Sequence, residues 1–295
     1  EKKHIPRVIS YVLVICIFVL ISLLLGYIVN NSLKNFIENI PQYEKQLQGL
    51  VVNTIALGES YGIAVDKKMI LDALNFSSFF GFTTNIIGSI GTFLSKFLLI
   101  VIGVAFILAE SKSFEKKLKV IFKQKREELE HFNQFSHNIQ KYFLVKSTTS
   151  FLTGFIIAVG LIIFGVDYPV LWGVIAMLFN FVPVVGSIIA AIPAVLLSLV
   201  SVDLNTTIAL IVFYVTINIS ISNIIEPKLM GKELGLSPLV IFFSLILWGW
   251  VLGIVGMFLA VPITMTLKIA FSSNSSTQWI AVLMSDITTK KEKKG

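Results

Sequence analysis

Long apolar runs separated by short polar stretches dominate the chain. A helix needs about 20 apolar residues to cross the roughly 30 Å hydrocarbon layer of a bilayer. Four runs are close to this length and are bounded by polar or charged residues: 8–29, 92–109, 148–166 and 207–225. The pattern predicts an all-α polytopic membrane protein in which these four runs are transmembrane helices.

Two further apolar runs, 169–200 and 238–270, are too long for one crossing and too short for two. The first is interrupted by Asn180-Phe-Val-Pro-Val-Val-Gly186, and the second contains Gly249, Gly253, Gly256 and Pro262. Proline removes a backbone donor and glycine permits a chain reversal. Each run therefore predicts a re-entrant helical hairpin, and the alternative is a single tilted or kinked helix.

Basic residues indicate the orientation. Residues 112–146 carry nine Lys or Arg against four acidic residues, whereas residues 30–75 carry four Lys against five acidic residues. Because cytoplasmic loops carry the excess of Lys and Arg, the first stretch is expected inside, and so are Lys290, Lys291, Lys293 and Lys294. A span followed by a hairpin then occurs twice in opposite orientation, which is an inverted repeat.

These patterns divide the chain into four regions. We expect residues 1–110 to form scaffold spans with an external helical segment at 30–90. Residues 111–147 are expected to be cytoplasmic, with an amphipathic interfacial helix at 129–143. Residues 148–272 would be the transport region of two span-plus-hairpin repeats, and residues 273–295 a cytoplasmic tail. The chain begins at Glu1, directly before an apolar run, so we expect further spans upstream.

Composition supports the membrane assignment. The chain is 55% hydrophobic and only 14% charged, against about 25% charged residues in soluble domains, so its apolar surface requires membrane lipid. The net charge of +7 is concentrated beside the apolar runs and indicates orientation rather than nucleic-acid binding. Cys16 is the single cysteine, and no GxxxxGK[ST], HExxH or GxSxG motif occurs. The sequence predicts neither an enzyme nor a cofactor or metal site.

Three polar residues are candidates for contact with a solute or ion. Glu226 ends the run 207–225, and an ionisable group near the membrane interior is costly and therefore indicates function. The alternatives are a solvated helix end or an ion pair with Lys228. Asn180 and Asn223 bring amide donors and acceptors to interrupted or terminal helical segments.

Other residues in the same motifs are expected to shape the backbone. Pro183, Gly186, Pro227 and Gly231 are assigned to hairpin geometry, with Pro227 expected to end its helix. Gly249 and Gly253 form a GxxxG spacing, which favours close helix packing over a ligand role.

The same motifs resemble a known family. Gly165-Val-Asp-Tyr-Pro169, Asn180-Phe-Val-Pro-Val-Val-Gly186, Glu226-Pro-Lys-Leu-Met-Gly231 and Gly235-Leu-Ser-Pro238 are similar to the signature of the autoinducer-2 exporter family of permeases. The resemblance implies a bacterial inner-membrane carrier of about eight membrane segments that forms symmetric oligomers, with a pentamer as the candidate. It also implies export of a quorum-sensing furanone or, in other members, exchange of sodium or lithium for protons. It points to Asn180, Pro183, Gly186, Glu226, Pro227 and Gly231.

Three functional hypotheses follow. The first is an ion-coupled secondary transporter that exports a small solute, with autoinducer-2 as the candidate, from a multi-pass position in the bacterial cytoplasmic membrane. The second is a sodium/proton antiporter in which Glu226 exchanges the ions. The third, of another class, is a membrane scaffold that transports nothing.

Overall fold

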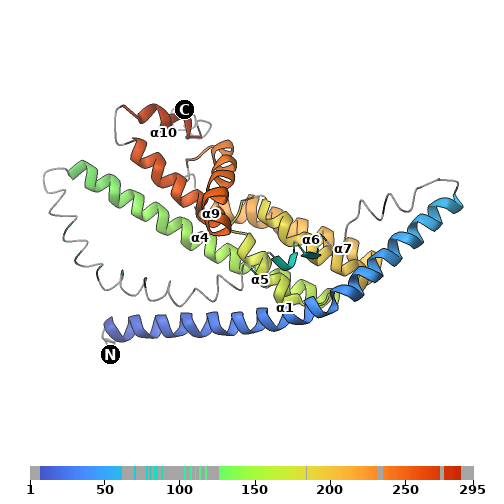
Figure 1. Ribbon diagram of the computed structural model, residues 1–295. Coiled ribbons are helices and arrows are strands. Elements are labelled where there is room, and N and C mark those ends of the chain that lie inside the picture. The colour runs from blue at the N-terminus through green and yellow to red at the C-terminus, as the bar shows by residue number, and fades with distance from the viewer. Residues whose placement is uncertain are drawn as a thin grey trace. The chain divides into compact units, whose positions relative to one another are not determined.

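The computed structural model describes residues 7–61, 126–183, 185–230, 235–272 and 276–286, with isolated positions between 70 and 117. All regular elements in these ranges are helices (Figure 1). One isolated β-bridge pairs Leu236 with Ser285. Three described helices are long and apolar enough to cross a membrane: Ser136–Phe164, Leu204–Leu229 and Val255–Ser272. The prediction of an all-α membrane protein is confirmed for this part of the chain. The expected span at 92–109 lies outside the described residues apart from Gly103 and Ile107.

Helix α1 (Arg7–Ser60) is 54 residues long. It covers residues 8–29, where we expected a span, and continues without a break into the segment that we expected to be separate. Val29, Phe36 and Tyr43 repeat every seven residues and are buried, which gives α1 one continuous inner face. Pro41 lies on the exposed side, so it does not interrupt that face.

Helix α4 (Arg126–Phe164) joins two elements that the sequence analysis separated, the interfacial helix at 129–143 and the span at 148–166. That separation is wrong. The junction, residues 144–147, contains neither glycine nor proline. In addition, Lys146 is buried against a partner, so its charge does not require a loop.

Helices α5 (Pro169–Phe179) and α6 (Val185–Ser201) form what we call the first helix pair. The chain reverses between them, and a Cβ atom at Gly186 would lie only 1.9 Å from the Phe179 carbonyl oxygen. Only glycine permits this approach. At the far ends of the two helices, the Ser201 hydroxyl donates a hydrogen bond of 3.0 Å to Asp167 Oδ2.

Helix α9 (Pro238–Ser272) forms the second helix pair, because it is broken at Gly253 (φ 66°, ψ −147°) into two arms, Pro238–Gly253 and Val255–Ser272. The arms fold back on each other (Figure 1). The Trp248 indole N–H donates to Thr264 Oγ1 at 3.1 Å, and a Cβ at Gly256 would lie 1.8 Å from the Trp248 carbonyl oxygen. Gly249 faces the Met257 side chain, consistent with the packing role that the GxxxG spacing indicates. For Gly253 that prediction is wrong, because this residue forms the break at positive φ and a Cβ there would meet no atom within 4 Å.

Along the chain, the two pairs are connected by α7 (Leu204–Ile219), the π-helical turn η1 (Ser220–Ile225) and α8 (Glu226–Met230). The expectation that Pro227 ends the helix is wrong. The Glu226 N–H bonds to the Ile221 carbonyl, five residues earlier, and this wider turn lets the chain continue through a proline to Met230.

The chain falls into two compact units. One comprises residues 1–111, 158–174 and 193–210, and the other residues 112–157, 175–192 and 211–295. In the first unit the Phe36 ring packs edge-on against those of Tyr168 and Trp172. The core of the second unit includes Tyr142, Val145, Leu236, Val261 and Met265.

The described part of the predicted tail contains the short helix α10 (Gln278–Leu283). Its end is fastened to the start of α9, since the Ser237 N–H donates to the Met284 carbonyl at 3.0 Å and Leu236 pairs with Ser285. The start of the second helix pair is therefore closed by backbone hydrogen bonds, whereas the ends of the first are joined through side chains.

Candidate functional site

A polar stripe runs along the buried face of α4. Lys146, Thr149, Ser150 and Thr153 recur at helical spacing, and all four are buried. The sequence analysis missed Lys146 because it placed residues 146 and 147 in the loop before the span, and it did not single out the three hydroxyl residues inside the span. The signal that could have revealed them is this spacing, which puts one cation and three hydroxyls on a single face of an apolar helix.

Glu226, at the start of α8, is the centre of the site. Its Oε1 atom lies 2.6 Å from Lys146 Nζ and accepts a hydrogen bond of 2.9 Å from the Thr149 hydroxyl. A longer hydrogen bond of 3.5 Å comes from Asn180 Nδ2. Lys228, the partner considered from the sequence, is exposed and is not paired with Glu226.

Asn180 connects this carboxylate to the first helix pair. It is the residue at which α5 gives way to the turn, and it is only 4% exposed. Its Nδ2 also donates to the Ser150 hydroxyl at 3.0 Å. We call Lys146, Thr149, Ser150, Asn180 and Glu226 the polar cluster. It joins α4, the turn of the first pair and α8 within the second unit.

The charges of the polar cluster are compensated internally. The Lys146 and Glu226 side chains are 5% and 12% exposed, so neither charge is well solvated. A buried ion pair is tolerated when further hydrogen bonds satisfy it, and removing one partner costs about 3–5 kcal/mol. The three donors converge on Oε1, and Oε2 makes no hydrogen bond with the described residues. As a carboxylate, Glu226 can take up a proton or accept further hydrogen bonds.

A buried hydroxyl lies near this carboxylate. Tyr142 precedes Lys146 by one turn of α4, is close enough to interact electrostatically with Glu226, and is buried. Its hydroxyl has no hydrogen-bond partner among the described residues. Because buried polar groups are normally paired, an unpartnered hydroxyl beside a charged cluster indicates a position where a polar solute or water could bind.

The other residues proposed from the sequence lie elsewhere. Asn223 is exposed on the π-helical turn and does not join the cluster. Pro183 lies in the turn of the first pair and Gly186 at its close approach, while Pro227 is exposed in α8. Gly231 lies outside the described residues. Groups of three or more His, Cys, Asp or Glu that could hold a metal are absent from the described ranges.

The turns of the two helix pairs are in contact. The centroid of the Phe258 ring, five residues after Gly253, lies 6.2 Å from that of the Phe181 ring and 6.5 Å from that of the Phe179 ring. Phe181 directly follows Asn180. The polar cluster and the contact between the two turns are therefore one residue apart along the chain.

The amino-acid sequence is similar to those of known proteins. The family model for AI-2E family transporters matches residues 1–275. A putative transport protein of Haemophilus influenzae is 33% identical over 95% of this chain and 83% of its own length. The AI-2 transport protein TqsA of Escherichia coli is 30% identical over 97% of this chain and 83% of its own. A putative transport protein of Borreliella burgdorferi is 33% identical over 81% of this chain. The chain therefore belongs to the AI-2E transporter family of membrane proteins, as the resemblance of its motifs implied.

Proposed function

We propose that this protein is a secondary transporter that exports a small polar solute across the bacterial cytoplasmic membrane, coupled to an ion through Glu226. Its relatives are named as transport proteins, and the name of the Escherichia coli relative makes autoinducer-2 the candidate solute. The observation that carries the proposal is the polar cluster, where donors from two elements converge on Glu226 Oε1. Buried charge in an apolar helical protein is costly and is typical of a transport pathway.

The cluster provides a physical route from charge to movement. Protonation of Glu226 removes the negative charge that holds Lys146 Nζ and attracts the Asn180 amide. Because Asn180 begins the turn of the first pair, weakening these contacts frees that turn to move. An ion can shift an equilibrium between two conformations only when it binds one of them more tightly. In this proposal the proton binds the conformation in which Glu226 and Lys146 are apart.

We further propose that the two helix pairs are re-entrant hairpins of an inverted repeat, with the C-terminus in the cytoplasm. The ends of the first pair meet at Asp167 and Ser201, and those of the second pair meet at Gly235 and Lys268. The contact between the two turns at Phe258 supports this proposal, because carriers built from broken helices have such turns meeting near the membrane midplane. Exposed apolar residues on α1, among them Leu20, Leu23 and Leu24, would face lipid or the neighbouring subunit of a symmetric oligomer, with a pentamer as the candidate.

The test is uptake of labelled autoinducer-2 into proteoliposomes under imposed proton or sodium gradients. Glu226→Gln keeps the size of the side chain and removes its charge, and Asn180→Ala removes the link to the turn. Loss of a hydrogen bond to a charged group costs about 1.5–3 kcal/mol, so each variant should lower flux roughly tenfold or more. Asn223→Ala is the matched control, because this exposed amide lies outside the cluster.

Each outcome discriminates between the hypotheses. Flux that Glu226→Gln abolishes under one gradient and Asn223→Ala preserves would support the carrier and identify the coupling ion. Sodium/proton exchange without solute uptake would replace it with the antiporter. If correctly assembled protein carried neither solute nor ion, the scaffold hypothesis would take its place.

A further inference from the structure

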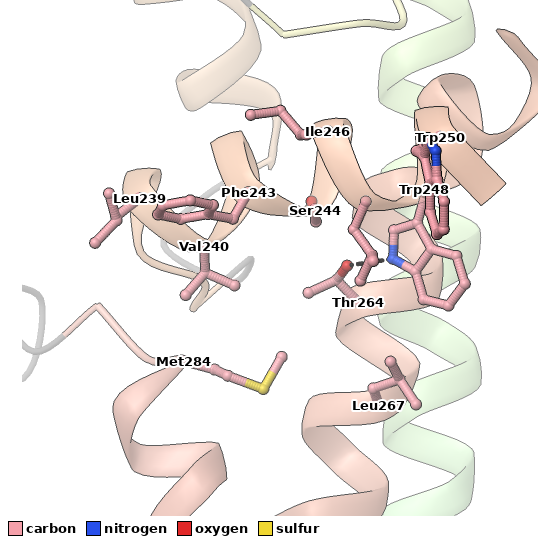
Figure 2. A pocket seen from close by; sticks show the side chains of 11 residues that line it. Leu239, Val240, Phe243, Ser244, Ile246, Trp248, Trp250, Thr264, Leu267 and Met284 are labelled. Atoms are coloured by element: carbon pink, nitrogen blue, oxygen red, sulfur yellow. Dashed lines mark hydrogen bonds between the residues drawn. The ribbon is translucent and has the colours of Figure 1, made fainter. Parts of the chain in front are cut away.

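An apolar groove lies on the second helix pair. Its volume is about 590 Å³, and it is bounded by both arms of α9 and by Met284 at the end of α10 (Figure 2). Most of its lining is aliphatic or aromatic: Leu239, Val240, Phe243, Ile246, Leu247, Trp248, Trp250 and Leu267. All of these residues belong to the second unit of the chain.

Three of the polar groups at the groove, those of Ser244, Trp248 and Thr264, are already engaged within the protein. The Trp248 indole N–H donates to Thr264 Oγ1 at 3.1 Å, drawn as a dashed line in Figure 2. The Ser244 hydroxyl donates to the Ile241 carbonyl at 2.8 Å. A polar solute would lose its hydration here without gaining these hydrogen bonds in return. The groove therefore suits a hydrocarbon chain.

The surroundings indicate the source of that hydrocarbon. The arm that carries Thr264 and Leu267 is long and apolar enough to cross a membrane. Leu239 and Phe243 are exposed at the groove, and Trp250 is 85% exposed. In a bilayer these side chains face lipid, so the groove is open to acyl chains.

Helix α10 adds a membrane-surface element beside the groove. Trp279, Val282 and Leu283 are all exposed, and their spacing places them on one face of the helix. The helix begins six residues after the apolar arm ends at Ser272, which keeps it near the membrane surface. Tryptophan is enriched at this interface.

We propose that the groove binds one acyl chain of a membrane phospholipid whose headgroup lies at α10. The bound chain would contact both arms of α9 together with Met284. It would therefore stabilise the second helix pair in its folded-back form. This lipid is distinct from the transported solute, because the groove lacks the polar cluster.

Fluorescence quenching can detect the site. The protein has four tryptophans, so a variant that keeps Trp248 alone places one fluorophore in the groove. Titration of the detergent-solubilised protein with brominated phosphatidylglycerol should quench Trp248 and saturate near one lipid per chain. A variant that keeps only Trp172, which is 0% exposed, is the control and should not be quenched.

A second experiment blocks the groove. Leu267→Trp fills it, and Ile208→Trp makes the same kind of change at an exposed position of α7 outside it. In native mass spectrometry, Leu267→Trp should lose the retained phosphatidylglycerol, whereas Ile208→Trp should keep it.

Two results would overturn the proposal. One is quenching of Trp248 that rises linearly without saturation, because that describes bulk lipid rather than a site. The other is efficient crosslinking between copies through a cysteine at Leu267 combined with no retained lipid, since the groove would then be covered by a second subunit.

Discussion

The two helix pairs share a close backbone approach at a glycine, but the turn of the first pair is polar and that of the second is not. Gly186 and Gly256 each lie so close to a carbonyl oxygen of the preceding arm, that of Phe179 or Trp248, that a Cβ would fall within 2 Å of it. Yet the first pair turns at Asn180, which hydrogen-bonds to Ser150 and Glu226, whereas the second turns at Gly253. The close approach is therefore a requirement of the reversal, and the polar turn is specific to the first pair.

The ends of the pairs differ as well. Side chains connect the ends of the first pair, where Asp167 accepts hydrogen bonds from Ser201 and from Tyr43 of α1. At the ends of the second pair the Lys268 side chain donates to the Gly235 carbonyl, and backbone hydrogen bonds to residues 284–286 additionally fix the start of α9. A side-chain link can be broken by protonation or by one substitution, whereas a backbone link cannot. The first pair is consequently better suited to move, and the second to stay folded against its groove.

The largest expected effect tests the close backbone approach that both pairs share. Gly186→Ala and Gly256→Ala each place a methyl group against a backbone carbonyl that cannot move aside, so each should destabilise the protein by ~5 kcal/mol or more. Gly249→Ala is the control, because its Cβ would meet only the flexible Met257 side chain, at 2.9 Å. Thermal unfolding of the purified protein measures the difference. Wild-type stability of Gly256→Ala would show that the second pair does not need its close approach.

The next effect tests the chemical difference between the pairs. Lys146→Met leaves Glu226 as an uncompensated buried charge, and Glu226→Gln does the same to Lys146, so each should cost about 3–5 kcal/mol. The double variant should recover most of this loss. In the second pair, Thr264→Val removes a neutral hydrogen bond and should cost only about 1 kcal/mol. Denaturant unfolding measures all four, and strictly additive costs of the two single substitutions would contradict an ion pair.

The smallest effect concerns the ends of the first pair and depends on pH. Burial, together with the Tyr168 and Asp167 interactions, raises the pKa of Tyr43 well above its ordinary value of 10.0. Tyr43 lies outside the three candidate spans. A raised pKa contributes stability that is complete below the unfolded-state pKa and is lost as the pH rises above it. Wild-type protein should therefore lose stability above about pH 10.

Tyr43→Phe isolates this contribution. The variant should cost about 1.5–3 kcal/mol at neutral pH, because it removes the 3.1 Å hydrogen bond to the Asp167 carboxylate. Its unfolding temperature should fall less steeply than that of wild type on going above about pH 10. Identical pH profiles for the two proteins would show that Tyr43 ionises as freely in the folded state as in the unfolded one.

Part of the candidate site could be predicted from single residues. Glu226 and Asn180 stand out because an ionisable group and an amide interrupt runs that are otherwise apolar. Lys146 and Thr149 could not be distinguished in this way, since they follow a basic stretch and resemble the polar border of a span. Their role depends on α4 continuing through residues 144–147, and that continuity depends on the partner that Lys146 finds 80 residues later.

The sequence by itself determined the helical class, the membrane environment, the family and the two runs of unusual length. Local composition is sufficient for these, because apolar length and the positions of proline and glycine act on their own neighbourhood. Only the tertiary structure decided that Glu226 pairs with Lys146 rather than Lys228, that Asn223 remains outside the cluster, and that the chain continues through Pro227. These outcomes arise because a buried charge or amide takes whichever partner the fold brings within about 3 Å, and sequence separation does not limit that choice.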